Sequence, residues 1–151
     1  MIKDDEFLQV IKHTPLVSID LIIRNEDSDI LLGQRCNKPA QNFWFVPGGR
    51  IQKNETIEQA FKRLINKELG INIAFSKASL LGAYNHIYAD NYLGQAGINT
   101  HYVVLGFELT ITTSQTLTGD NQHSRLQWWP LTELMQESKV HENTKAYFKI
   151  S

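Results

Sequence analysis

The fold of this chain is decided by a loop and a helix in the middle of the sequence. They read G-G-R-I-Q-K-N-E-T-I-E-Q-A-F-K-R-L-I-N-K-E-L-G-I, from Gly48 to Ile71. Apolar residues recur here at helical spacing, which predicts one amphipathic helix. We expect Asn54 to cap its N-terminus and Gly70 to cap its C-terminus. The apolar stripe consists of Ile57, Ala60, Phe61, Leu64 and Ile65.

One acidic residue, Glu68, falls on this apolar stripe. It follows Phe61 by seven positions and Leu64 by four, so it should face the protein rather than the solvent. The negative end of the helix dipole disfavours a carboxylate there, and burial without a partner costs several kcal/mol. Either the last turn frays and Glu68 meets water or a Lys, or a hard cation such as Mg²⁺ binds it. The helix alone leaves both interpretations open.

Length, charge and cysteine content narrow the class of protein. A chain of 151 residues suits one domain, and we expect a single domain over 1–151. A formal net charge of −1 gives no basic footprint for nucleic acid or for an anionic membrane. The single Cys36 cannot form an internal disulfide, and the first residues lack the apolar core of a signal peptide. These features predict a cytoplasmic protein without a membrane span.

Short apolar runs on both sides of the helix predict β-strands. Two of them flank the polar turn R-N-E-D-S-D and should form a hairpin, and Pro130 should open a short helix. Trp128 and Trp129 should point to opposite faces of the sheet. One long helix among successive strands favours an α+β sandwich. The expected strands are 16–23, 30–35, 43–46, 79–88, 100–112 and 125–129, and the expected later helices are 130–138 and 142–150.

The spacing of the central stretch resembles the Nudix hydrolase box, G-x5-E-x7-R-E-U-x-E-E-x-G-U, in which U is a bulky aliphatic residue. Two acids of the box are missing, because the chain has Leu64 and Lys67 where the box has Glu. The resemblance implies a Nudix-type α/β/α sandwich with a mixed central sheet, and a metal-dependent hydrolase of nucleoside diphosphate derivatives. The matching residues are Gly49, Glu55, Arg63, Ile65, Glu68, Gly70 and Ile71.

Most of the chain, from about Thr14 to Phe148, resembles the GDP-mannose mannosyl hydrolase branch of this family, whose box carries the same R-L-x-x-x-E variant. The resemblance implies hydrolysis of GDP-mannose to GDP and mannose, with water attacking and inverting the sugar C1. GDP-glucose stays an alternative substrate, because mannose and glucose differ at one hydroxyl. A homodimer is implied as well. The similar segments are T-P-L-V-S-I-D, L-L-G-Q-R-C-N-K-P-A-Q-N-F-W-F-V-P-G-G-R-I-Q-K-N-E-T, N-T-H-Y-V-V-L-G-F, D-N-Q-H and V-H-E-N-T-K-A-Y-F.

The branch also implies a metal site and a general base. One Mg²⁺ per subunit would be bound by the carbonyl of Gly48 and by the side chains of Glu68 and Gln122. Mn²⁺ could replace it, because both ions accept oxygen ligands. His123 would be the general base, a role that suits a side chain with an unperturbed pKa of about 6.5.

The arginines on either side of the Pro-Gly-Gly turn, Arg35 and Arg50, are implied to bind phosphate oxygens through their guanidinium forks and to assist catalysis. From the residues alone, Asp20 could face either the solvent or a cleft. Arg63 could pair with Glu55 to hold the loop. The substrate contacts implied by the resemblance are Asp20, Arg35, Arg50, His86 and Tyr102.

Two other functions stay open at this point. An ordinary Nudix pyrophosphohydrolase would cut the phosphoanhydride and release a nucleoside monophosphate. A catalytically silent Nudix module would bind its ligand without turnover, and the acids missing at Leu64 and Lys67 would then mark lost activity. Lone histidines on loops are more often solvent-exposed than catalytic, so the role of His123 depends on the resemblance.

Overall fold

The computed structural model describes residues 2–114, 117 and 125–149. The α-helices in this part of the chain are α1 (Asp4–His13), α2 (Ile57–Leu69), α3 (Leu131–Gln136) and α4 (Glu142–Lys145). Two short 3-10 helices are η1 (Phe75–Lys77) and η2 (Ala146–Phe148). The strands are β1 (Leu16–Arg24), β2 (Ile30–Gln34), β3 (Trp44–Phe45), β4 (Gly48–Arg50), β5 (Ser79–Tyr88), β6 (Thr100–Thr110) and β7 (Leu126–Trp129).

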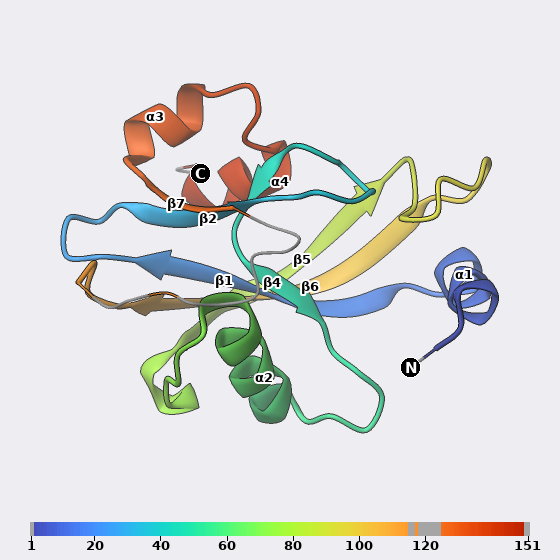
Figure 1. The fold of residues 1–151 in the computed structure, drawn as a ribbon, viewed down its shortest axis with the longest axis horizontal. Helices are drawn as coiled ribbons and strands as arrows, with labels where there is room; N and C mark the ends of the chain where they lie inside the picture. The colour runs from blue at the N-terminus through green and yellow to red at the C-terminus, as the bar shows by residue number, and fades with distance from the viewer. Residues whose placement is uncertain (1, 115–116, 118–124, 150–151) are drawn as a thin grey trace.

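Within the described residues the strands form one seven-stranded sheet, in the order β3-β2-β1-β6-β5, with β4 beside β1 and β7 beside β2. β1 runs parallel to β6 from the pair Leu16↔Tyr102 to the pair Arg24↔Thr110. The other paired strands are antiparallel. Helix α2 covers one face of the sheet, and α3 and α4 lie on the other (Figure 1). This arrangement confirms the predicted α+β sandwich with a mixed central sheet.

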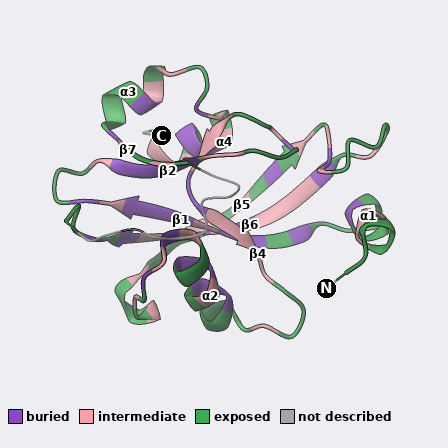
Figure 2. Ribbon diagram, viewed as in Figure 1, coloured by how far each residue is buried: buried purple, intermediate pink, exposed green. Residues whose placement is uncertain are grey.

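Each face of the sheet has its own apolar core, which Figure 2 shows as buried segments along the central strands. Phe61 and Ile65 of α2 are fully buried on one face, and burial of a side chain of this size contributes about 2 kcal/mol. Ile57, at the start of the predicted stripe, is 45% exposed and contributes little. Trp128 packs against the α2 core and Trp129 lies in the opposite core, as strand alternation predicts.

Both ends of α2 are capped, but the N-terminal cap differs from the prediction. Thr56 is the N-cap instead of Asn54: its hydroxyl accepts a hydrogen bond from the Gln59 N–H, and the Gln59 side chain accepts one from the Thr56 N–H. The two bonds form a capping box. Asn54 lies before the helix at φ 69°, a left-handed conformation that Asn tolerates well. Gly70 ends the helix at φ 72°, as predicted.

Three other segments differ from the prediction. The sequence indicates no element before residue 14, yet Asp4–His13 forms α1, which packs through Phe7 against Tyr92 with ring centroids 5.5 Å apart. The predicted strand 43–46 shortens to β3, and the residues after it pair with β1 as β4. The predicted terminal helix 142–150 divides into α4 and η2.

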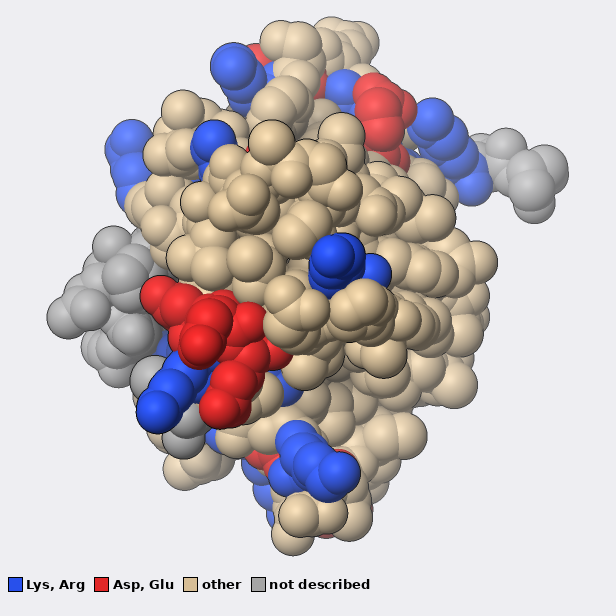
Figure 3. Space-filling model, turned by 90° about the vertical axis from the view of Figure 1, so that its right-hand side faces the viewer, with Lys and Arg blue, Asp and Glu red and all other residues tan. Residues whose placement is uncertain are grey.

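The surface carries charges of both signs. On the face shown in Figure 3, the Lys and Arg side chains that the structure describes lie in separate small groups, and a group of acidic side chains lies among them. This face therefore offers no continuous basic surface. None of the helices in the described residues combines the length and the apolar character that crossing a membrane requires.

Candidate active site

Arg63 anchors the loop that joins β4 to α2. Its Nε donates to Oε2 of Glu55 at 2.5 Å, and its Nη2 donates to Oε1 of the same carboxylate at 2.9 Å. A further bond runs from Nη2 to the Arg50 carbonyl oxygen at 2.9 Å. Hydrogen bonding to Arg63 holds the pKa of Glu55 below its ordinary value. The predicted Arg63–Glu55 pair is therefore present, and it fixes the end of β4 against α2.

Strand β4 lies in close contact with both of its neighbours. A side chain at Gly48 would collide with the Ile19 carbonyl oxygen of β1, so only glycine fits there. A Cβ at Gly49 would lie 2.6 Å from Cδ2 of Leu64, whose side chain is 2% exposed. Leu64 thus packs beneath β4 as part of the core, at a position where the box has an acid.

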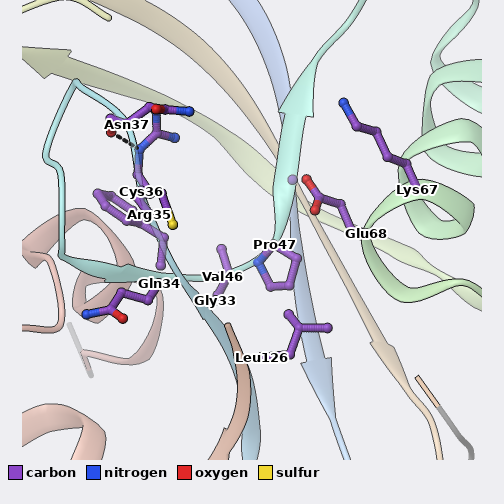
Figure 4. A pocket seen from close by; sticks show the side chains of 12 residues that line it. Gly33, Gln34, Arg35, Cys36, Asn37, Val46, Pro47, Lys67, Glu68 and Leu126 are labelled. Atoms are coloured by element: carbon purple, nitrogen blue, oxygen red, sulfur yellow. Dashed lines mark hydrogen bonds between the residues drawn. The ribbon is translucent and has the colours of Figure 1, made fainter. Parts of the chain in front are cut away.

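Glu68 lines a hollow of about 230 Å³ between the end of α2 and the β2–β4 segment. Its side chain is half-buried. Figure 4 shows the carboxylate pointing from α2 toward β4, with Arg35 across the hollow and Lys67 beside it. Glu68 therefore faces the sheet, as its place on the apolar stripe predicts.

The oxygens of this hollow fit one hard divalent ion. Leu21 donates to the Pro47 carbonyl at 2.8 Å, and antiparallel rungs alternate, so the next pair, Asp20↔Gly48, is not hydrogen-bonded. The ladder therefore directs the Gly48 carbonyl away from β1. A carbonyl and the Glu68 carboxylate suit Mg²⁺, which usually takes its other oxygens from water and phosphates.

The described part of the chain adds no further metal-binding cluster. Within it, no group of three or more His, Cys, Asp and Glu side chains is arranged to hold an ion. Gln122, the third ligand implied by the resemblance, and His123, the implied base, lie outside the described residues.

A second cavity, of about 90 Å³, adjoins the hollow and shares the lining residues Arg35, Phe45, Val46 and Gly48 with it. Its lining brings together the five residues that the resemblance implies as substrate contacts, although they come from five separate segments. We call this space the inner cavity. The five residues are Asp20, Arg35, Arg50, His86 and Tyr102.

Two titratable side chains face each other in the inner cavity. Burial raises the pKa of Asp20 to about 7, although a hydrogen bond from the Tyr147 hydroxyl, at 2.6 Å, and nearby Arg35 oppose the rise. Burial lowers the pKa of His86 to about 4, so its imidazole is neutral at neutral pH. The 4.0 Å contact between His86 Nδ1 and Asp20 Oδ2 is therefore not a salt bridge near pH 7. Asp20 faces the cavity rather than the solvent.

The two arginines of the inner cavity rest on aromatic rings. The guanidinium of Arg35 lies 5.8 Å from the centroid of Phe45, and that of Arg50 lies 4.8 Å from the centroid of Phe7 in α1. Neither arginine forms an ion pair with another described residue. Guanidinium groups that have no ion-pair partner in the described part of the chain suit an anionic ligand.

Sequence reasoning missed two residues that support this site. Tyr147 of η2 reaches Asp20 from 127 positions away, and Phe7 of α1 supports Arg50. Neither residue carries a local signal, because each acts only through contacts that the fold creates. His141 has a structural role in this region: its Nδ1 accepts a hydrogen bond from the Asn143 N–H at 3.0 Å and caps α4.

A known family model matches the part of the sequence that contains the glycine pair, the loop and helix α2. A model described as the NUDIX domain matches residues 14–149. The chain belongs to the Nudix family. As a Nudix hydrolase it carries a box with one of its usual acids, Glu68, facing the hollow, while Leu64 is buried in the core.

Relatives and solved structures agree with this assignment. The chain is 42% identical over 126 residues to the low-salt glycan biosynthesis protein Agl8 of Haloferax volcanii, which covers 83% of this Nudix chain and 77% of that protein. It is 31% identical over 128 residues to an ADP-ribose pyrophosphatase of Methanocaldococcus jannaschii, covering 85% and 69%. A MutT Nudix hydrolase structure from Burkholderia pseudomallei superposes with a TM-score of 0.72 at 25% identity, covering 89% and 96%.

Proposed function

We propose that this Nudix hydrolase converts GDP-mannose to GDP and mannose, with water attacking the sugar C1 and inverting its configuration. One observation carries the proposal. The inner cavity, with Asp20, His86 and Tyr102 in its wall, opens beside a hollow that Glu68 lines, and Arg35 lines both. The hollow suits a diphosphate with one hard cation, and the inner cavity suits sugar hydroxyls. The bond between them would then be the one that joins sugar to diphosphate.

The diphosphate would lie along the shared wall, where Arg35 and Arg50 offer guanidinium groups to its oxygens. Gly48, Glu68 and Gln122 would hold one Mg²⁺, of which Gln122 lies outside the described residues. When bound, this ion stabilises the negative charge that develops on the departing GDP. Stabilised GDP is a good leaving group, so the reaction needs no acid to protonate it.

The inner cavity would orient the sugar. Tyr147 holds Oδ2 of Asp20, which leaves the other carboxyl oxygen for a sugar hydroxyl, and neutral His86 can donate or accept a hydrogen bond. His123, assigned from the D-N-Q-H resemblance, would take a proton from the attacking water. The bond between C1 and the phosphate oxygen breaks at the same time, and its electron pair leaves with GDP. Inversion requires this base on the far face of the sugar.

The names of the relatives support two candidate functions. A relative named for low-salt glycan biosynthesis agrees with a sugar-containing substrate. A relative named as an ADP-ribose pyrophosphatase instead favours attack at phosphorus, with release of a nucleoside monophosphate. We place the glycosyl reaction first, because Leu64 is buried and one acid of the box faces the hollow.

Products formed in ¹⁸O-labelled water separate the candidates. The protein is incubated with GDP-mannose and Mg²⁺, and the products are identified by mass spectrometry. Label in mannose, with unlabelled GDP, is the expected result. GMP with mannose 1-phosphate would overturn the proposal in favour of attack at phosphorus, and saturable binding without turnover would indicate a silent binding module. GDP-glucose in a parallel reaction tests the second hexose.

We further propose that the chain acts as a homodimer of single-domain subunits in the cytoplasm, and that Mn²⁺ can replace Mg²⁺ in turnover. These proposals follow the family resemblance. Light scattering on the purified protein would give twice the chain mass of 17.3 kDa for a dimer, whereas the mass of one chain would contradict it. Fractionation of cells that express the chain tests the location.

A further inference from the structure

Lys67 lines the same hollow as Glu68, although neither the box nor its usual metal chemistry calls for a cation there. It is the residue before Glu68 in the last turn of α2, and it is exposed. Figure 4 shows its side chain extending from α2 beside that of Glu68, with Arg35 on the opposite side of the hollow. Positively charged side chains therefore line the hollow on both sides, Lys67 from α2 and Arg35 from the opposite side.

The charges that line this hollow favour an anion. Among its described lining residues, Arg35 and Lys67 are positive and Glu68 is negative. Lys67 forms no ion pair with any other described residue, whereas Lys62, on the same helix, lies 3.3 Å from Glu58. The positions three and four residues from Lys67 hold no Asp or Glu, so α2 offers its ammonium no partner of the kind that Lys62 has.

A lysine beside a metal ligand is unfavourable for a cation alone, because its ammonium repels the ion. The arrangement becomes favourable when the ligand brings more negative charge than the ion neutralises. A diphosphate meets this condition, since its oxygens can contact the ion, Arg35 and Lys67 together. The other effect of Lys67, a favourable interaction with the helix C-terminus, would stabilise α2 but would not change ligand binding.

We propose that Lys67 binds the diphosphate of the nucleotide from the α2 side of the hollow, opposite Arg35. It would supply a fixed positive charge at a position where a Glu would recruit a further divalent ion. The inference rests on the proposed function only in requiring a nucleoside diphosphate or its sugar ester as ligand. It holds whichever bond of that ligand is cut.

Calorimetric titration with GDP tests this role in three proteins: wild type, Lys67→Met and the matched control Lys62→Met. Each titration is made with Mg²⁺ and again with EDTA. We expect Lys67→Met to bind GDP about three- to tenfold more weakly in both conditions, and Lys62→Met to stay within about twofold of wild type. Mg²⁺ titrated alone should bind Lys67→Met no more weakly than wild type, because a repulsive charge has been removed.

Equal GDP affinity in Lys67→Met and wild type would overturn the inference. So would an equal loss in Lys62→Met, because it would indicate a general effect of surface charge. Inorganic pyrophosphate serves as a second probe. If wild type binds pyrophosphate but not GDP, the proposal that the substrate is a guanine nucleotide is wrong. The role of Lys67 is then tested by comparing the pyrophosphate affinities of Lys67→Met and wild type. A wild type that binds neither probe overturns both proposals.

Discussion

Replacing Arg63 by Met should destabilise the loop between β4 and α2. The change removes two bonds to Glu55 and one to the Arg50 carbonyl. The Arg63 and Glu55 side chains are 29% and 14% exposed, so water partly screens the pair. The three hydrogen bonds of Arg63 should therefore stabilise the fold less than fully buried charged hydrogen bonds would. We expect Arg63→Met to lower the free energy of unfolding by about 2 kcal/mol, which corresponds to a fall of roughly 4–8 °C in Tm.

A double-mutant cycle isolates the ion pair. Urea unfolding is measured for wild type, Arg63→Met, Glu55→Gln and the double variant, and we expect a coupling energy of about 1 kcal/mol at pH 7. The exposed Lys62–Glu58 pair, whose side chains are 57% and 56% exposed, provides the matched control cycle. Its coupling should be about 0.3 kcal/mol.

The pH dependence of the coupling has a definite sign. The folded-state pKa of Glu55 lies below its ordinary value of 4.5, chiefly because of the hydrogen bond from Arg63. The pair therefore stabilises the fold fully above pH 4.5, and this stabilisation is lost as the pH falls through the lowered folded-state pKa. A coupling energy that does not exceed that of the control cycle at pH 7, or that rises as the solution is acidified, would refute this reasoning.

Three further changes address the chemistry. Glu68→Gln should weaken the Mg²⁺ dependence and the turnover together, which is checked by measuring the rate of the variant as Mg²⁺ is titrated. Full activity in this variant would exclude Glu68 as a metal ligand. His123→Ala should lower kcat while calorimetry finds GDP binding retained, and an unchanged kcat would exclude it as the base. Tyr147→Phe should lower kcat by roughly tenfold, because Asp20 loses the 2.6 Å bond that positions it. A change in Tm without any change in kcat would make the role of Tyr147 purely structural.

The elements that the sequence predicts well are those whose stabilising contacts are local. The period of α2, its final glycine and the Arg63–Glu55 pair all lie within 17 consecutive positions, from Asn54 to Gly70. Helix α1 differs, because Ile11 is its one buried residue among those the structure describes. Its packing depends instead on distant partners of Phe7, so its own periodicity is a weak signal.

Strand β4 and the cap of α2 show how tertiary contacts override local preference. Gly48 and Gly49 favour a turn, but the backbone bonds to β1 draw them into the sheet, where the absence of a side chain allows close contact. Asn54 and Thr56 are both good N-caps. Asn54 takes the left-handed turn, and Thr56 completes a T-x-x-Q capping box with Gln59, a signal that the sequence already contains.

The two box acids that this chain lacks have different structural replacements, and the difference bears on where water attacks. Leu64 fills the core beneath Gly49, so that position gives the hollow no charge at all. Lys67 instead adds a positive charge to the hollow that Arg35 already lines. A further divalent ion would therefore meet repulsion, whereas a diphosphate that leaves intact would gain attraction from both walls as its charge grows. Under the proposed function, fixed cations assist the departure of GDP, and a single ion held by Glu68 is sufficient.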